Sequence, residues 1–310
     1  ISMEADHREA VELGLLMKKT GNKLLEILGG RAIHPVNVTV GGFYRAPRSV
    51  ELKAMLPDLE SGREAALDAL KWVASFDYPD LAVPYDHVSL AHPDEYPLNE
   101  GNVVSSDGLD IAVEEYENHF HERQVPQSTA LQSVRLPGEM PFLVGPLARL
   151  NNCFDQLRPT AKKAVESLRL NWPLYNNFQS IVVRMVELVH AFDEAAAIVQ
   201  RLQGDLALSR VDYALRAGEG CHATEAPRGI LYHRYRIGED GLIAEAKIVP
   251  PTAQNQGQIE EDLKQFVPRF ASLDDAALTG KCEQLIRNYD PCISCATHFL
   301  QLKIDRNVAG

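Results

Sequence analysis

The chain has 310 residues, of which 45% are hydrophobic, and its formal net charge is −12. This apolar fraction is enough for a sizeable core. The acidic balance argues against a nucleic-acid partner, because binding to phosphates requires clustered lysine and arginine. The sequence predicts no membrane span, since it lacks an apolar run of about eighteen residues. Five cysteines without a regular framework are not typical of a secreted disulfide scaffold and favour the cytoplasm.

The N-terminal half is predicted to begin with a helix over residues 6–28, which Gly29 and Gly30 can end. An extended segment over residues 33–40 and a second helix over residues 59–76 follow. Residues 80–142 mix proline, glycine and short β-like runs, which indicates a small α/β lobe.

Helical periodicity returns over residues 145–168 and is strongest over residues 174–202, where an apolar stripe is most simply a core face. The pattern then predicts two strands, over residues 230–236 and 242–249, joined by hairpin turn residues at 238–241. Short helices are expected near residues 258–267 and over residues 274–288. The chain is therefore predicted to be one mainly α domain with small β additions, including a β-hairpin.

Near the C-terminus, Cys292 and Cys295 form a C-x-x-C pair, with His298 three residues further on. Thiolates at this spacing can turn toward one metal or form a redox pair. A thioredoxin-like pair is disfavoured because this one follows a helix, and a c-type haem site because Ala296 stands where histidine is required. A structural zinc site completed by Cys282 or His298, and a pair of buried thiols, both remain open.

The residues around this pair, and four segments before it, resemble the large subunit of [NiFe]-hydrogenases in their amino-acid sequence and in their order along the chain. The similar segments are Gly29–Pro35 (G-G-R-A-I-H-P), Gly145–Asn151 (G-P-L-A-R-L-N), Arg216–Gly229 (with E-A-P-R-G), Val249–Asn255 (V-P-P-T-A-Q-N) and Asp290–His298 (D-P-C-I-S-C-A-T-H). Their amino-acid sequences most resemble those of the cytoplasmic, NAD(P)-coupled members of the family, including the sulfhydrogenases. The resemblance implies a long-helix bundle with small α/β lobes.

The resemblance also implies a nickel–iron centre whose iron carries CO and cyanide, and reversible heterolytic cleavage of H2. Cys292 would be a terminal nickel ligand and Cys295 a bridging one, since soft thiolates suit both metals. Electrons would pass to a small subunit bearing iron–sulfur clusters, and then to flavin- and NAD(P)-binding subunits. No glycine-rich phosphate loop is visible in this chain, so nucleotide is expected to bind elsewhere.

By the same resemblance, Arg228 would lie over the metal pair, and Asp290 would pair with it and hold it in place. Pro250, Pro251 and Thr252 match the segment around the cyanides, where a hydroxyl or backbone N–H can donate a hydrogen bond. The structural alternatives are a surface arginine after a proline and a helix-ending aspartate.

Two histidines match family positions. His298 corresponds to the histidine at the processing site, which can bind a magnesium or iron ion. His34 corresponds to a histidine between the metal centre and the partner's nearest iron–sulfur cluster. The alternatives are a helix-side histidine without metal and an ordinary His-Pro element before a strand.

One departure from the family limits this interpretation. The family's other two nickel thiolates belong to an upstream C-x-x-C, and no such motif precedes Cys292. Because the sequence opens almost inside a helix, we expect residues 1–310 to be a single large-subunit domain lacking the family's N-terminal portion, active only if the other thiolates are supplied. Two further hypotheses are a non-catalytic structural relative, like the homologous subunit of respiratory complex I, and a zinc-stabilised interaction module.

Overall fold

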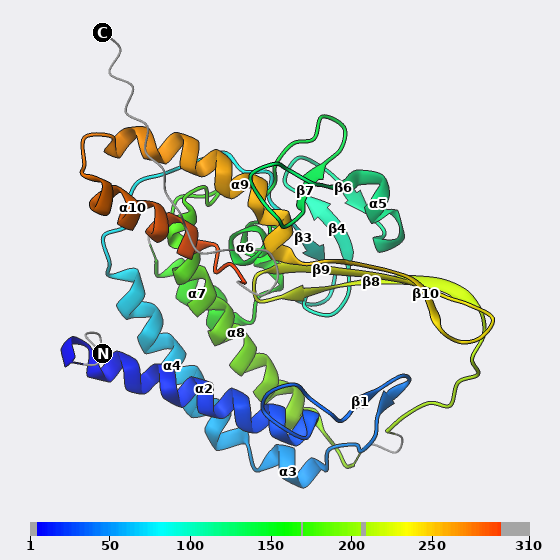
Figure 1. Ribbon diagram of the computed structural model, residues 1–310. Coiled ribbons are helices and arrows are strands. Elements are labelled where there is room, and N and C mark those ends of the chain that lie inside the picture. The colour runs from blue at the N-terminus through cyan, green and yellow to red at the C-terminus, as the bar shows by residue number, and fades with distance from the viewer. Residues whose placement is uncertain (1–4, 169, 206–208, 293–310) are drawn as a thin grey trace. The chain divides into compact units, whose positions relative to one another are not determined.

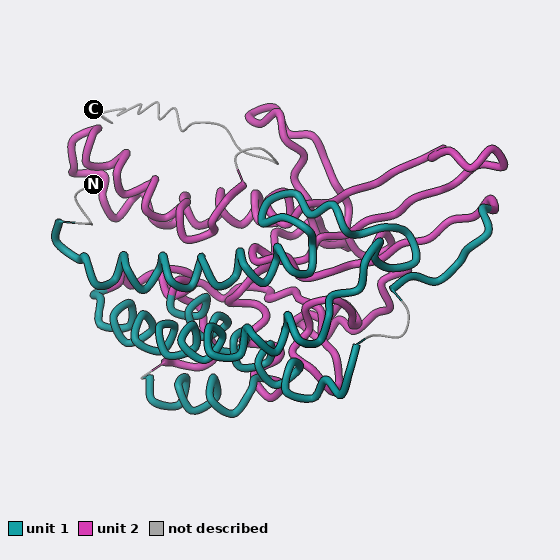
Figure 2. Tube along the Cα trace, turned by 90° about the horizontal axis from the view of Figure 1, so that it is seen from below, with its two compact units in different colours: residues 1–77, 157–169, 182–215 teal, residues 78–156, 170–181, 216–310 magenta. Residues whose placement is uncertain are grey.

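The computed structural model describes residues 5–168, 170–205 and 209–292. The chain divides into two compact units, which Figure 2 shows in different colours. Unit 1 comprises residues 1–77, 157–169 and 182–215, and unit 2 comprises residues 78–156, 170–181 and 216–310. The expectation of a single domain stays a prediction.

Unit 1 is helical, with one small hairpin (Figure 1). Its elements are α2 (Arg8–Gly29), β1 (Val38–Thr39), β2 (Gly42–Phe43), α3 (Ser49–Lys53), α4 (Leu56–Ala74), α7 (Pro159–Glu166) and most of α8 (Ser180–Arg201). The first two predicted helices are thus confirmed. α2 ends at Gly30, whose φ of 83° lets its N–H return to the carbonyl of Glu26. The predicted extended segment contains only the two-residue strand β1.

The predicted helix over residues 145–168 is wrong in one respect, because the structure divides it. It contains α6 (Pro146–Cys153), the 3-10 turn η2 (Phe154–Gln156) and then α7. The break falls at Arg158, whose backbone is extended. Proline disfavours helical backbone in the residue before it, so Pro159 begins a new helix instead of continuing the old one.

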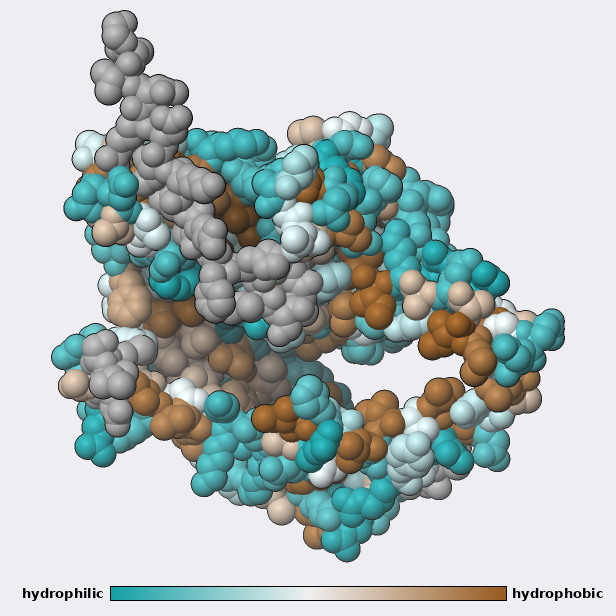
Figure 3. Space-filling view, in the orientation of Figure 1, coloured by the Kyte–Doolittle hydropathy of each residue, from teal (hydrophilic) through white to brown (hydrophobic). Residues whose placement is uncertain are grey.

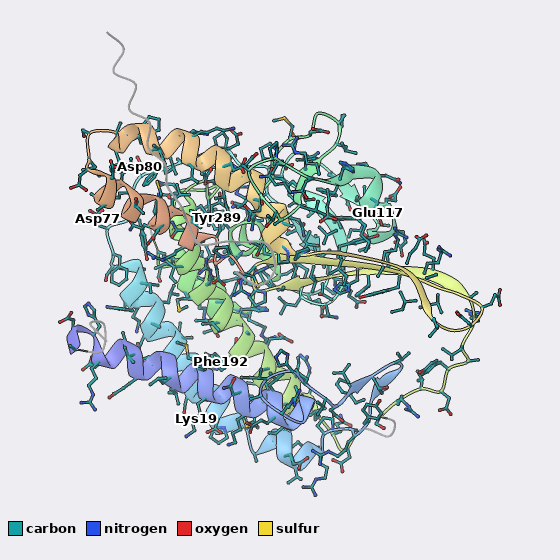
Figure 4. All side chains as sticks on the ribbon, viewed as in Figure 1. Lys19, Asp77, Asp80, Glu117, Phe192 and Tyr289 are labelled. Atoms are coloured by element: carbon teal, nitrogen blue, oxygen red, sulfur yellow. The ribbon has the colours of Figure 1, made fainter. Side chains whose placement is uncertain are left out.

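α8 carries the apolar stripe that the sequence predicted, although the helix begins at Ser180, later than expected. Its buried members on α8 are Val182, Val189, Phe192, Ala196 and Val199, whereas Phe178 is buried in the 3-10 turn Asn177–Gln179 before the helix. Within unit 1, Phe192, labelled on α8 in Figure 4, contacts α4 at Gly62. A Cβ atom at Gly62 would lie 2.6 Å from the Phe192 ring, so the close approach of these helices depends on glycine.

The described part of unit 2 contains three small antiparallel sheets and several helices. The sheets are β3 (Val88–Ala91), β4 (Asn102–Ser105) and β5 (Asp110–Ile111); β6 (Phe120–Arg123) and β7 (Gln132–Arg135); and β8 (Gly218–Ala226), β9 (Gly229–Ile237) and β10 (Ile243–Val249). The helices are η1 (Val113–Glu115), α5 (Tyr116–His119), α6, η2, η3 (Asn177–Gln179), α9 (Pro251–Phe266), η4 (Val267–Phe270) and α10 (Asp275–Asn288). α9 and α10 lie side by side (Figure 1).

The core of unit 2 joins these sheets. Its buried side chains include Val88, Leu90, Val103, Tyr116, Phe120, Phe142, Ile230 and Tyr232. Tyr116 stacks on Phe120 and on Tyr232, with ring centroids 4.7 and 4.3 Å apart. A nearby carboxylate, Glu117 on α5, accepts hydrogen bonds from Tyr232, Arg234 and Lys247. These bonds join β9 and β10 to α5 within unit 2.

β9, β10 and their hairpin turn agree with the prediction from the sequence, whereas β8 was not predicted. This strand pairs with β9 over its whole length, from Gly218 opposite Ile237 to Ala226 opposite Gly229. Gly218 and Gly220 weaken the strand signal, because glycine has low strand propensity. At the outer end of this sheet Leu242 and Ile243 are exposed, and Figure 3 shows hydrophobic surface there.

The start of α9 also differs from the prediction, since the helix begins at Pro251 and not near residue 258. Its first turn contains Thr252, Gln254 and Asn255, which give little helical periodicity but are all buried. The mainly α class with small sheets is confirmed. None of the described helices is long and apolar enough to cross a membrane.

Substitution of Gly62 by alanine should destabilise unit 1, although the same change in a free helix stabilises it. The new methyl group must displace the Phe192 ring, and such overpacking costs about 1–3 kcal/mol. Gly21→Ala in α2 is the matched control, because a Cβ there meets nothing within 4 Å. It should add about 0.5–1 kcal/mol of stability. Urea unfolding of both variants measures the difference, and equal stabilisation by the two would contradict the proposed packing.

The buried side chain of His87 should make the folded protein less stable at acid pH. Its side chain is buried between the rings of Tyr85 and Tyr175, beside the Asn151 amide, and burial lowers its pKa to about 4. The unfolded chain, with a histidine pKa of about 6.5, takes up the proton first. The contribution to stability is therefore complete above pH 6.5 and lost as the pH falls from 6.5 to 4.

A pKa difference of this size corresponds to about 2–4 kcal/mol. Unfolding free energies of the wild type and His87→Gln, measured at pH 7 and pH 4.5, provide the check. The wild type should lose about 2 kcal/mol more than the variant over this interval. Equal losses would show that His87 does not titrate as its burial requires.

Candidate metal centre

Cys292 lies just beyond the end of α10, in unit 2. Tyr289 caps this helix, and Asp290 follows with a left-handed φ of 49° and an N–H that donates to the carbonyl of Arg287 (3.0 Å). Aspartate tolerates this conformation better than most residues, and the proline after it cannot continue a helix. The predicted thiol ligand therefore follows a well-defined helix end.

The backbone of Cys292 is bound to the start of α9. Its N–H donates to the hydroxyl oxygen of Thr252 over 3.1 Å. Thr252 is buried and follows Pro250, the N-cap, and Pro251, the first helical residue, a place that suits proline because no N–H is needed there. A hydroxyl that accepts one hydrogen bond keeps its own proton for another acceptor. The structure thus brings the predicted segment Pro250–Thr252 beside Cys292.

The structure also brings Arg228 and Asp290 together. The Nε of Arg228 donates to the backbone carbonyl of Asp290 (2.5 Å) and lies 3.2 Å from its carboxylate oxygen Oδ2. The two side chains are 36% and 44% exposed, so water screens the pair and its energy is small. Its effect is geometric, because one bond to a backbone carbonyl fixes the direction of the guanidinium.

Arg228 occupies the tight turn between β8 and β9, which lies close against the segment before α6. A Cβ atom at Gly145 would be 2.7 Å from the Arg228 carbonyl oxygen, and one at Gly229 would be 2.4 Å from the side chain of Val144. Both glycines have positive φ, 110° and 132°. Only glycine permits this approach, which explains why the two glycine-containing segments meet here.

A buried ion pair supports the same turn, and the sequence analysis did not identify it. Arg149 on α6 donates to the carboxylate of Glu225 (2.7 Å) and to the carbonyls of Ala226 (2.9 Å) and Pro227 (3.0 Å). The other carboxylate oxygen accepts from the N–H of Leu90 (2.9 Å). The side chains are 2% and 0% exposed. Residues 225–227, which precede Arg228, are therefore held by charge-assisted hydrogen bonds.

The first turn of α9 contacts two further segments through amide side chains. Gln254 donates to the carbonyl of Ile230 on β9 (2.6 Å). Asn255 both accepts from the N–H of Val144 (2.9 Å) and donates to its carbonyl (3.2 Å). Both amides are buried. The sequence shows only that three of the residues 252–255 are polar, whereas their burial, which requires backbone partners, is a tertiary property.

The remaining predicted site residues lie outside the described residues or in unit 1. Cys295 and His298 lie outside the described residues. His34 belongs to unit 1, where it is exposed with φ of 52°, and its carbonyl accepts from Arg31 (2.5 Å). Cys282, considered as a zinc ligand, is buried within α10, and burial raises its pKa, which favours the neutral thiol.

The described residues fit one side of a thiolate-bound metal centre. Cys292 is only half-buried, its N–H is bound to a hydroxyl, and a guanidinium is bound to Asp290 two residues before it. Over residues 5–168, 170–205 and 209–292, no group of three His, Cys, Asp or Glu side chains is placed to hold a metal ion. Cys292 is a half-buried soft ligand at the end of the described part of unit 2.

Replacing Arg149 by alanine should destabilise the protein by about 3–5 kcal/mol, because the charge of Glu225 stays buried without its partner. Arg123→Ala is the matched control in unit 2. It removes an ion pair with Glu139 that is 37% and 53% exposed, and should cost no more than about 1 kcal/mol. Thermal unfolding of both variants distinguishes the two effects. Similar losses would mean that the Arg149 pair is not the support inferred here.

Comparison with known proteins agrees with this geometry. The model of the nickel-dependent hydrogenase family matches residues 110–298, more than half of the chain. The sulfhydrogenase 1 alpha subunit of Pyrococcus furiosus is 29% identical over 305 residues, covering 97% of this chain and 71% of the relative. The beta subunit of the NAD-reducing hydrogenase HoxS of Cupriavidus necator is 25% identical, covering 94% of this chain and 66% of the relative.

Among solved structures, an NAD+-reducing [NiFe]-hydrogenase in the H2-reduced state superimposes with a TM-score of 0.82. The aligned residues cover 96% of this chain and 70% of the solved chain, and 23% of them are identical. This similarity shows the fold, and the family match includes the candidate metal centre. The chain belongs to the nickel-dependent hydrogenase family.

Proposed function

We propose that this chain is the large subunit of a [NiFe]-hydrogenase that cleaves H2 reversibly into protons and electrons. The family supports an oxidoreductase acting on H2. The observation that carries the proposal is the contact of Arg228 with Asp290 within two residues of Cys292, whose backbone is bound to Thr252. A thiol ligand, a cation and a hydroxyl thus lie on neighbouring segments of unit 2.

In this proposal Cys292 and Cys295 hold the nickel–iron centre, with CO and cyanide on the iron. The centre, when bound, supplies a soft, redox-active metal pair that can polarise H2. The family's other two thiolates have no C-x-x-C counterpart before Cys292, so activity requires that they be supplied.

The chain's own residues orient and stabilise charge around that centre. Among the described residues only the Nε of Arg228 is engaged, so its two terminal nitrogens remain able to donate toward a small ligand. Asp290 fixes the direction of that guanidinium. The proton of the Thr252 hydroxyl can be donated to a cyanide nitrogen. A fixed donor of this kind needs no reorganisation during the reaction.

The proposal extends to partners and to two histidines. The relatives include a sulfhydrogenase and an NAD-reducing hydrogenase, which supports an iron–sulfur small subunit and flavin- and NAD(P)-binding subunits as partners. His34 would face the nearest iron–sulfur cluster, and His298 would bind magnesium or iron. The cytoplasmic location expected from the cysteine pattern is part of the same proposal.

The test uses the complex purified with its partner subunits from the native organism or a host with the maturation machinery. Metal analysis should find nickel and iron, and infrared spectra should show bound CO and cyanide. Arg228→Lys should retain the metals but lower kcat for H2-dependent dye reduction by about 100-fold, the typical cost of one misplaced electrostatic donor. Cys292→Ser should lose nickel.

Arg236→Lys is the control, because Arg236 is exposed on β9 and pairs with Glu245 instead. It should leave kcat unchanged. Zinc alone in the complex would support the interaction module, and a complex without metal would support the structural relative. Either result would overturn the proposed function.

A further inference from the structure

The most unusual buried group of unit 2 outside the contacts described above is a carboxylate in the middle of α9. Asp262 is fully buried. Its Oδ2 accepts hydrogen bonds from the hydroxyls of Tyr85 (2.8 Å) and Tyr289 (2.6 Å), and its Oδ1 accepts from the Gln258 amide (3.0 Å). These three donors are neutral. Among the described residues no cation contacts this carboxylate, and burying a carboxylate with neutral donors alone is costly.

One of these donors leads directly to the candidate metal centre. Tyr289 caps α10 and precedes Cys292 by three residues, and Figure 4 shows it at the end of that helix. The segment Tyr289–Cys292 is therefore bound to α9 at both ends: the Tyr289 hydroxyl to Asp262 and the Cys292 N–H to Thr252. Between these points lies Asp290, in a left-handed conformation that persists only when its surroundings hold it.

The other hydroxyl provides an internal comparison. Tyr85 donates to the same carboxylate oxygen and is equally well buried, 4% exposed against 5% for Tyr289. It lies in the segment before β3, far from Cys292 in sequence. The two tyrosines thus make the same bond to the same atom, but only one belongs to the segment that carries the thiol.

We propose that Asp262 is a positioning residue for the metal centre, acting through Tyr289 to set the place of Cys292. The role of this positioning in catalysis rests on the proposed function. A ligand on a short segment is located by both ends of that segment, and loss of one end allows it to move. Outer partners of metal ligands typically contribute about 10–100-fold in metal affinity.

The first measurement is nickel release from the purified complex to a chelator. Tyr289→Phe should accelerate release by about tenfold, whereas Tyr85→Phe should change it by less than about twofold. Both variants lose one hydroxyl hydrogen bond to Asp262, so their thermal midpoints should fall by similar amounts. Equal release from the two variants, or no acceleration in either, would overturn the proposal.

Two substitutions of Asp262 separate positioning from proton transfer. Asp262→Asn keeps an acceptor oxygen for both tyrosines, provided that the Gln258 amide turns to accept from the new NH2 group. It should retain nickel and kcat within about twofold of the wild type, whereas Asp262→Leu should release nickel as Tyr289→Phe does. A large loss of kcat in Asp262→Asn with nickel retained would indicate proton transfer and contradict positioning.

A second readout does not depend on the metal. In the metal-free protein, alkylation of Cys292, followed by mass spectrometry of its peptide, should be about fivefold faster in Tyr289→Phe than in the wild type or Tyr85→Phe, the effect of one lost hydrogen bond. Unchanged alkylation would overturn the inference. A wild-type complex without nickel would overturn the proposed function alone, because the alkylation comparison still decides the role of Asp262.

Discussion

The candidate metal centre depends on the first turn of α9. Buried polar side chains must find hydrogen-bond partners, since an unsatisfied one costs about 1–3 kcal/mol. Each polar residue of this turn finds its partner on the backbone of a different segment: Thr252 at Cys292, Gln254 at Ile230 and Asn255 at Val144. Apolar packing alone would tolerate small displacements between these segments. Directed bonds fix their register as well as their distance.

The Arg149–Glu225 pair also holds a backbone segment through directed hydrogen bonds, but its groups are charged. Its burial costs solvation energy, which is offset because both groups also bind backbone atoms. The turn that carries Arg228 becomes rigid as a result. This matters because the exposed contact between Arg228 and Asp290 contributes little energy by itself. The buried pair therefore holds the backbone from which Arg228 projects, and the bond to the Asp290 carbonyl then sets the direction of the guanidinium.

Local periodicity predicted the elements that depend on it, namely the apolar stripe of α8, the hairpin of β9 and β10, and the helix α10. It failed at β8, at the first turn of α9 and at Pro159, where glycine, buried amides or a proline replaced the regular pattern. The resemblance indicated segments that the structure brings together beside Cys292, while their role at a metal stays a prediction. It did not reveal that Arg149 and Glu225, 76 residues apart, form a pair, because such pairing is a tertiary property.

The kind of bond around Cys292 also suits a site that is proposed to release and take up protons. Its backbone partner is a hydroxyl, and the neighbouring segments are joined by amides, none of which titrates over the physiological range. Arg149 and Glu225 are shielded from water and bound to each other. Even Asp262 is held by neutral donors, so the bonds that define its place persist as long as one oxygen accepts. A metal centre supported in this way keeps its geometry while protons move near it, and buried neutral hydrogen bonds achieve this where surface ion pairs would not.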